Sequence, residues 1–186
     1  MNVNLDDMLS YNQRFVEKKD YEPYRTNNIP NKRTVIFTCM DTRLVELLPK
    51  ALNIQNGDVK MVKNAGAILR DPFDSIMKSI LVAIYELQAE QVIVIGHHDC
   101  GMSHMKTEAF KQGMKHRGIS AETLQTIDHA GIDLDREFAG FHSVEESVEE
   151  SVSVIKNHPL IPDDVGVHGL TIDPETGKID LVTKGQ

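Results

Sequence analysis

Three short runs of β-branched and apolar residues constrain the fold of this chain more than any other feature. They occupy residues 34–38, 59–62 and 92–95, and segments with helical spacing separate them. Short, nearly continuous apolar runs are typical of strands that are buried on both faces of a parallel sheet. Strands that alternate with helices predict an α/β fold, in which helices at 45–52 and 72–89 connect the three strands.

The last quarter of the chain adds two more strand patterns, at residues 165–172 and 179–182. The segment between them, Asp173 to Gly177, reads Asp-Pro-Glu-Thr-Gly, which is typical of a hairpin turn. We therefore predict a mainly parallel four-stranded sheet with a fifth, antiparallel strand and with helices on both faces. Further helices are expected at residues 6–18, 102–115, 121–128 and 144–157.

The length of 186 residues is that of one compact domain. We predict a single domain over residues 1–186, in which residues 1–30 form an N-terminal helical arm. The stretch from Tyr21 to Arg33 contains Pro23 and Pro30, which break any helix before the first strand.

The charge and hydropathy of the chain exclude several classes of partner. A formal net charge of -8 repels phosphate backbones, so no nucleic-acid partner is predicted. No apolar run reaches the length needed to span a bilayer, and the first ten residues lack the pattern of a secretory signal. We therefore predict no membrane partner and a cytoplasmic location.

Polar residues gather where three of the predicted strands end. Cys39, Asp41 and Arg43 alternate after the first strand, 64–66 follow the second and 97–101 follow the third. The carboxyl ends of parallel strands meet at one edge of the sheet, where α/β proteins bind their ligands. Alternating residues of an extended segment project to one side. These residues are therefore predicted to form one site.

Cys39, His97 and Cys100 offer two sulfurs and one nitrogen, a donor set that suits Zn²⁺. Three protein ligands leave a fourth tetrahedral position for water or substrate, which is the pattern of catalytic zinc. Asp41 could orient a zinc-bound hydroxide, or could bind zinc itself as a fourth ligand in a resting state. A bidentate pair with Arg43 would hold this carboxylate off the metal and keep it ionised.

Each of these residues also has an ordinary structural interpretation. The cysteines alone would be buried thiols, His97 a turn histidine, and Asp41 with Arg43 a surface salt bridge worth about 0–1 kcal/mol. A thiol redox protein is another alternative, although the two cysteines lack the Cys-x-x-Cys spacing. The metal interpretation is favoured because both cysteines fall beside predicted strand ends, close to charged or imidazole partners that core packing does not require.

The spacing Cys-x-Asp-x-Arg followed by His-x-x-Cys resembles the β-class carbonic anhydrases. The resemblance covers roughly residues 33–182, and the short chain without tryptophan is similar to the small microbial branch of that class. It implies Zn²⁺ held by Cys39, His97 and Cys100. It also implies that Asp41 and Arg43 form a catalytic dyad. Ala65, Gly66 and Gly101 are implied to line the substrate pocket.

The activity that this resemblance implies is the reversible hydration of carbon dioxide to bicarbonate by zinc-bound hydroxide. The family is built as dimers or multiples of dimers, so a homodimer is expected. Two alternatives stay open: hydrolysis of carbonyl sulfide or carbon disulfide at the same site, and a catalytically inert zinc-binding module. His98 and His104 lie close to the ligand turn and are candidates for carrying the released proton to solvent.

Overall fold

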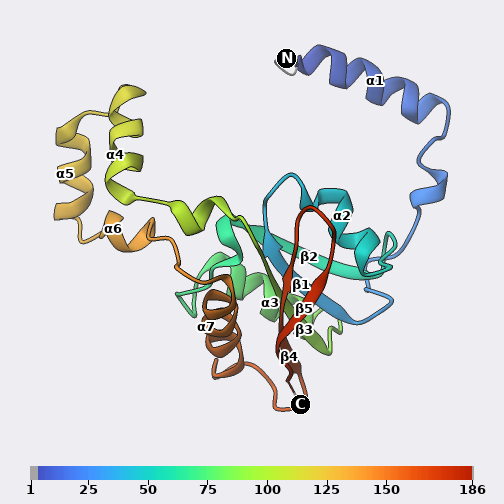
Figure 1. Cartoon of the computed structure of the whole chain (residues 1–186). Helices are drawn as coiled ribbons and strands as arrows, with labels where there is room; N and C mark the ends of the chain where they lie inside the picture. Colours follow the sequence, from blue (N-terminus) through green and yellow to red (C-terminus); the bar gives the residue numbers. More distant parts are fainter. Residues whose placement is uncertain (1–3, 186) are drawn as a thin grey trace.

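The computed structural model describes residues 4–185, and its centre is a five-stranded sheet in the order β2-β1-β3-β4-β5 (Figure 1). β4 runs parallel to β3 and antiparallel to β5, while β1 is parallel to both of its neighbours. The predicted sheet is confirmed, and every predicted strand agrees within two residues. The strands are β1 (Thr34–Cys39), β2 (Val59–Asn64), β3 (Gln91–His97), β4 (Gly166–Ile172) and β5 (Ile179–Thr183).

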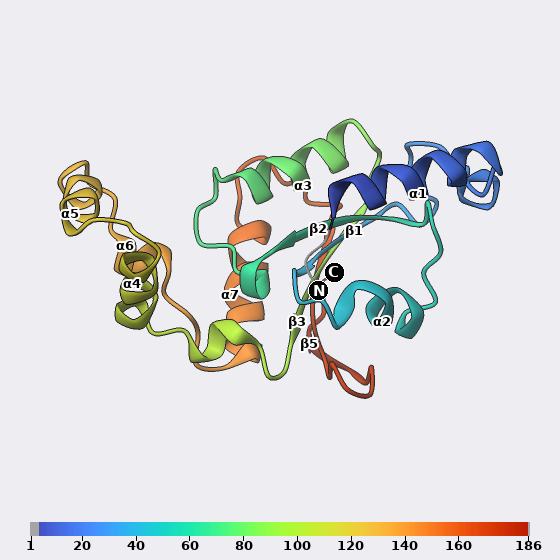
Figure 2. The ribbon, with the colours of Figure 1, turned by 90° about the horizontal axis from the view of Figure 1, so that it is seen from above.

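Helices cover both faces of the sheet, as predicted (Figure 2). On one face, α3 (Ser75–Tyr85) and α7 (Val144–Lys156) pack against alternate residues of β1 and β3, in a cluster that includes Phe37. On the other face, α2 (Leu44–Ala51) packs against the intervening residues, in a cluster that includes Ile36. This second cluster also contains Cys39 and Cys100, so the core itself fixes two of the predicted metal ligands.

The close approach of α7 to the sheet depends on two glycines. A Cβ atom at Gly96 would lie 2.6 Å from Cγ2 of Val144, and a Cβ atom at Gly169 would lie 2.7 Å from Cγ1 of Val148. Real Cβ atoms do not approach other atoms so closely, so a larger residue would push the helix away. The glycines therefore set the depth at which α7 sits beside the end of β3.

Two predicted helices have different bounds. The helix expected over 72–89 is shorter because Asp74 caps its start, accepting a hydrogen bond from the N–H of Met77, and because Gln88 has a positive φ of 59° that no helix can include. The helix expected over 102–115 is divided. Met105 and Lys106 are extended, and they separate the 3-10 turn η3 (Gly101–His104) from α4 (Thr107–His116).

The remaining short elements include one predicted helix, and the others were not predicted. The helix expected over 121–128 is α5 (Ala121–His129), whereas the four-residue helix α6 (Leu134–Glu137) was not predicted. Two 3-10 turns complete the fold, η1 (Glu22–Tyr24) and η2 (Ala65–Ala67).

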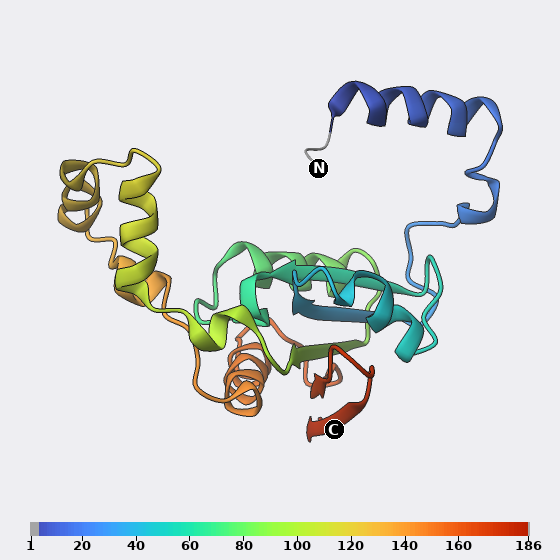
Figure 3. The ribbon, with the colours of Figure 1, turned by 45° about the horizontal axis from the view of Figure 1, so that its top comes forward.

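Two parts of the chain stand away from the sheet. Figures 1 and 3 show α1 (Leu5–Glu17) on one side, and α4, α5 and α6 on the other. We call the latter, residues 107–137, the projecting helices. No residue of α1 or of the projecting helices is buried. The predicted arm over 1–30 thus contains α1 and η1, while residues 1–3 and 186 lie outside the described part of the chain.

Within residues 4–185, no helix combines the length and the apolar character that crossing a membrane requires.

Candidate metal centre

The three predicted metal ligands meet at the carboxyl end of the sheet. Cys39 is the last residue of β1, His97 is the last residue of β3, and Cys100 precedes η3. Their donor atoms all lie within 4.8 Å of one another, and the two Sγ atoms are 4.0 Å apart. Two sulfurs bound at about 2.3 Å to one tetrahedral zinc lie about 3.8 Å apart, so the spacing of the two thiols fits this ion.

The imidazole of His97 is oriented for metal binding. Its Nδ1 lies 2.8 Å from the backbone carbonyl oxygen of His98, an arrangement in which Nδ1 carries the proton and donates it. The other nitrogen, Nε2, is buried and has no hydrogen-bond partner among the described residues. A buried polar atom without a partner is costly, whereas a lone pair that faces two thiols is satisfied when it binds a metal ion. The residues present therefore fit a zinc ion.

The two cysteines differ in acidity because they share one proton. A hydrogen bond from the thiol of Cys100 lowers the pKa of Cys39 to about 4, against the opposing effect of burial. The N–H of Gly66 also donates to Sγ of Cys39 over 3.3 Å. The pKa of Cys100 is raised, because the same hydrogen bond and burial both favour its neutral thiol. One thiolate is thus available near neutral pH, and binding of a metal must displace the proton of the second.

Asp41 and Arg43 form a bidentate pair at the edge of this centre. Nε and Nη2 of Arg43 donate to Oδ1 and Oδ2 of Asp41 over 3.0 and 2.8 Å. The guanidinium group lowers the pKa of Asp41 to about 2, so the carboxylate is ionised at neutral pH. Its Oδ2 lies 3.7 Å from Nε2 of His97, which places a negative charge directly beside the metal donors.

A second carboxylate, which the sequence analysis did not single out, also contacts Arg43. Nη1 of Arg43 donates to Oδ2 of Asp99 over 2.9 Å, and Nη2 donates to the backbone oxygen of Asp99 over 2.9 Å. Asp99 lies between the two ligands of the His-x-x-Cys turn. Its presence inside that turn was the one available signal, but the turn alone does not indicate that its side chain reaches a residue 56 positions away.

The residues predicted to line the substrate pocket lie in different surroundings. Gly66 is buried in η2 and contacts Sγ of Cys39, whereas Ala65 is exposed at the end of β2. A Cβ atom at Gly101 would meet no atom within 4 Å, so there is open space directly beside Cys100. Of the two candidate proton carriers, His104 is exposed on η3 and His98 is half-buried.

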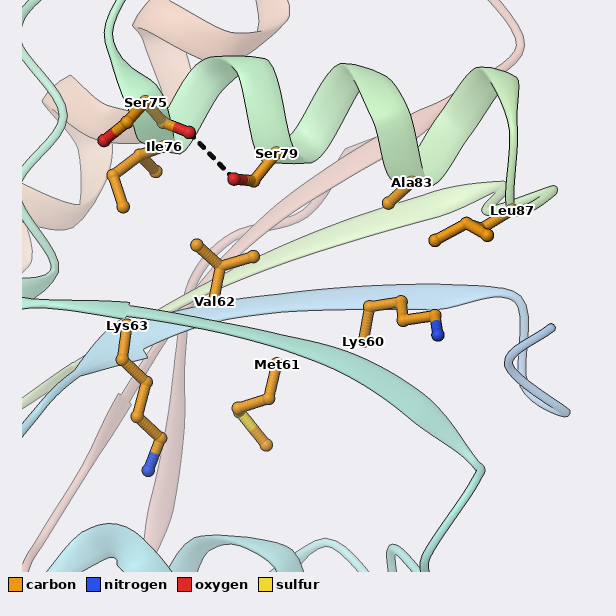
Figure 4. Close-up of a pocket in the computed structure, with 9 residues that line it drawn as sticks. All are labelled: Lys60, Met61, Val62, Lys63, Ser75, Ile76, Ser79, Ala83 and Leu87. Carbon is orange, nitrogen blue, oxygen red and sulfur yellow. Dashed lines mark hydrogen bonds between the residues drawn. The ribbon is translucent and has the colours of Figure 1, made fainter. Parts of the chain in front are cut away.

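Two cavities of the described structure differ in whether they border the metal donors. A cavity of about 300 Å³ is lined by His97 and Cys100 together with His98, His142 and Glu145. The other, of about 440 Å³, is a groove between β2 and α3, shown in Figure 4. Its lining includes none of the three donors.

This α/β protein thus carries two thiols and an imidazole at the strand ends of a parallel sheet, with open space beside them, and this group could hold a metal ion. Comparison with known proteins identifies its family. The family model described as carbonic anhydrase matches residues 34–179, which is most of the chain. The chain therefore belongs to the carbonic anhydrase family, and the resemblance to the β class that the sequence suggests is confirmed.

Several relatives match most of the length of this chain. "Putative carbonic anhydrase YvdA" of Bacillus subtilis is 57% identical over 183 residues, covering 98% of this chain and 93% of the relative. A second B. subtilis protein, "Putative carbonic anhydrase YtiB", is 55% identical, covering 97% of each chain. A carbon disulfide hydrolase of Acidithiobacillus thiooxidans is 31% identical over 164 residues, covering 83% of this chain and 80% of the relative.

Solved structures agree with this assignment. A β-carbonic anhydrase of Trichomonas vaginalis superposes with a TM-score of 0.89 at 31% identity, and each chain is covered completely. A carbonic anhydrase of Streptococcus mutans gives a TM-score of 0.73 at 29% identity, covering 98% of this chain and 100% of the other.

Proposed function

We propose that this protein catalyses the reversible hydration of carbon dioxide to bicarbonate, with Zn²⁺ held by Cys39, His97 and Cys100. The observation that carries the proposal is the convergence of these donor atoms within 4.8 Å, with Nε2 of His97 lacking any other partner in the described chain. When bound, zinc lowers the pKa of a coordinated water and so supplies the nucleophile for carbon dioxide. Family membership supports the same reaction.

In this proposal, Asp41 orients the nucleophile, and Arg43 holds the carboxylate of Asp41 in position. The ionised carboxylate, 3.7 Å from Nε2 of His97, is placed to accept a hydrogen bond at the open ligand position. Because both of its oxygens accept hydrogen bonds from Arg43, the carboxylate is held away from the position of a fourth ligand. This pairing favours an open catalytic site over the inert module in which Asp41 closes the coordination sphere.

Access for the substrate is supported by the small residues around the ligands. The open space beside Gly101 leaves room for a linear triatomic molecule next to Cys100. Gly66 donates its backbone N–H to Sγ of Cys39, which stabilises the thiolate, and the side chains of Ile68 and Met102 pack closely against this glycine. Ala65, exposed at the entrance of η2, completes the proposed pocket.

Stopped-flow hydration of carbon dioxide by the zinc-loaded protein tests the reaction. The Asp41→Ala variant is expected to lose activity by about 100-fold or more, a usual effect of removing a positioned acid or base. Asp135→Ala serves as the matched control, because Asp135 is another carboxylate paired with a cation, Lys111, but lies on the projecting helices. Equal activity in Asp41→Ala and the parent protein would remove the proposed dyad.

Hydrolysis of carbon disulfide or carbonyl sulfide at the same centre is the second candidate. Three of the similar proteins are named carbon disulfide hydrolases, at 29 to 31% identity. The same zinc-loaded preparation should therefore be assayed with all three substrates. If hydrogen sulfide is released faster than carbon dioxide is hydrated, carbon disulfide or carbonyl sulfide is the preferred substrate instead of carbon dioxide.

A homodimer is the proposed assembly, with α1 packing on a second copy. Leu5, Met8 and Leu9 of α1 are each more than half exposed. The groove between β2 and α3 presents the apolar side chains of Val62 and Ile76 beside the edge strand β2, with Lys60 on its border, whereas Lys63 points away from α3 (Figure 4). The first turn of α1 is acidic, so its charge complements that of the groove. Sedimentation of a Leu5→Glu/Leu9→Glu variant should show a monomer where the parent protein shows a dimer.

A reducing compartment such as the cytoplasm is proposed because the centre needs both cysteines as free thiols. Cys39 and Cys100 are free, with sulfurs only 4.0 Å apart, and an oxidising compartment would favour their loss to a disulfide. Thiol titration of protein purified from the native host, with and without a reductant, checks this location.

A further inference from the structure

The guanidinium group of Arg43 is held from two sides. Toward Asp41 it donates two hydrogen bonds, from Nε and Nη2. Toward Asp99 it donates two more, from Nη1 to the carboxylate and from Nη2 to the backbone oxygen. Four hydrogen bonds engage most of the five N–H donors of an arginine, so the plane of the group is fixed. Asp41 alone would fix one edge of the group only.

Asp99, the second hydrogen-bond partner of Arg43, lies next to the metal donors in the sequence. It lies inside the turn that joins His97 to Cys100, and its φ of 52° is in the left-handed region. Its side chain is 75% exposed, so it contributes little to folding stability. The same turn thus supplies two metal donors and the carboxylate that orients Arg43.

We propose that Asp99 is a positioning residue that locks Arg43 in the orientation that keeps Asp41 off the metal. Oδ2 of Asp41 is 3.7 Å from Nε2 of His97, so a small movement would bring this oxygen into the fourth ligand position. An Arg43 that is free to turn could follow that movement, whereas an Arg43 anchored to Asp99 resists it. Asp99 thereby keeps the open position available. This role rests on the proposed function, since it concerns the open position of the same centre.

The test measures the open position directly, without relying on catalysis. Cobalt(II) replaces zinc in the purified protein, and azide, a small anion that needs a vacant ligand position, is titrated while the visible spectrum is recorded. Asp99→Gly removes the side chain and tolerates the positive φ, while Asp99→Asn keeps an uncharged acceptor in the same backbone conformation. Azide affinity is expected to fall by about tenfold in Asp99→Gly and by less in Asp99→Asn.

Two further variants separate positioning from a structural role. Asp99→Gly combined with Asp41→Ala lacks the competing carboxylate, so its azide affinity should return toward that of the parent protein. Asp135→Asn, an exposed and paired carboxylate far along the chain, should bind azide like the parent protein. Parent affinity in Asp99→Gly, or no recovery in the double variant, would overturn the proposal.

The hydration assay of the zinc-loaded parent protein is run alongside. An inactive parent protein in which the azide pattern still holds would contradict the proposed reaction but support the positioning role. An active parent protein whose azide affinity does not depend on Asp99 would contradict only the positioning role.

Discussion

The metal centre and the projecting helices differ in what holds their residues in place. Cys39, His97 and Cys100 are each at most 5% exposed and belong to the core at the strand ends. The projecting helices have no buried residue. The ring of Phe110 in α4 contacts the ring of Phe138, directly after α6, with 4.6 Å between the ring centroids. Order at the metal centre therefore comes from the whole sheet, whereas the projecting helices can open locally without unfolding it.

The largest effect that tests this difference is the loss of a metal ligand. His97→Ala should lower zinc affinity by more than about 100-fold, because even residues behind the ligands contribute about 10–100-fold in other zinc sites. His116→Ala, at the end of α4, is the matched histidine in the projecting helices and should keep full zinc content. Metal analysis after dialysis measures both variants. Equal zinc content would contradict the assigned centre.

Packing under α7 should give the next largest effect. The Cβ atom of Gly169→Ala would lie 2.7 Å from Cγ1 of Val148 and 3.2 Å from Cγ2 of Val152, so the helix must shift. Overpacking of this kind costs about 1–3 kcal/mol of the free energy of unfolding. Urea unfolding of the variant and the parent protein measures the difference. An unchanged midpoint would mean that α7 does not depend on this contact.

A glycine-to-alanine substitution in the projecting helices should stabilise the local structure instead of destabilising it. A Cβ atom at Gly113, inside α4, meets no atom within 4 Å, and alanine favours a helix over glycine by about 0.5–1 kcal/mol. Hydrogen exchange of the α4 amides in Gly113→Ala should slow accordingly, while the urea midpoint of the sheet stays unchanged. A matching rise in the global midpoint would show that the projecting helices unfold together with the core.

The sequence predicted the buried part of the molecule better than the projecting part. Strand positions and the convergence of Cys39, His97 and Cys100 could be predicted because apolar runs and the spacing of these residues beside strand ends are local signals. The break in the helix at Met105 and Lys106 could not be predicted, because the helical pattern of the sequence continues across these two residues. The contact of Asp99 with Arg43 was also missed, because it depends on which two turns the parallel strands bring together.

The smallest effect concerns acid stability, and it compares two capped turns. Asp173, in the turn between β4 and β5, accepts hydrogen bonds from the N–H groups of Thr176 and Glu175, which lower its pKa. Asp133, before α6, accepts in the same way from the N–H groups of Asp135 and Arg136. Each carboxylate closes its turn, but only the first turn joins strands of the central sheet.

A carboxyl with a lowered pKa stabilises the folded state above its unfolded pKa of about 3.9, and this contribution is lost as the pH falls through the folded pKa. Asp173→Asn keeps an acceptor but no charge, so the metal-free variant should be less stable than the parent at pH 6. That difference should shrink below about pH 4, as the parent carboxylate becomes protonated. Urea midpoints at pH 3, 4 and 6 measure it. Asp133→Asn should leave all three midpoints unchanged, because its turn opens with the projecting helices, and a shift there equal to that of Asp173→Asn would mean that the two regions unfold as one.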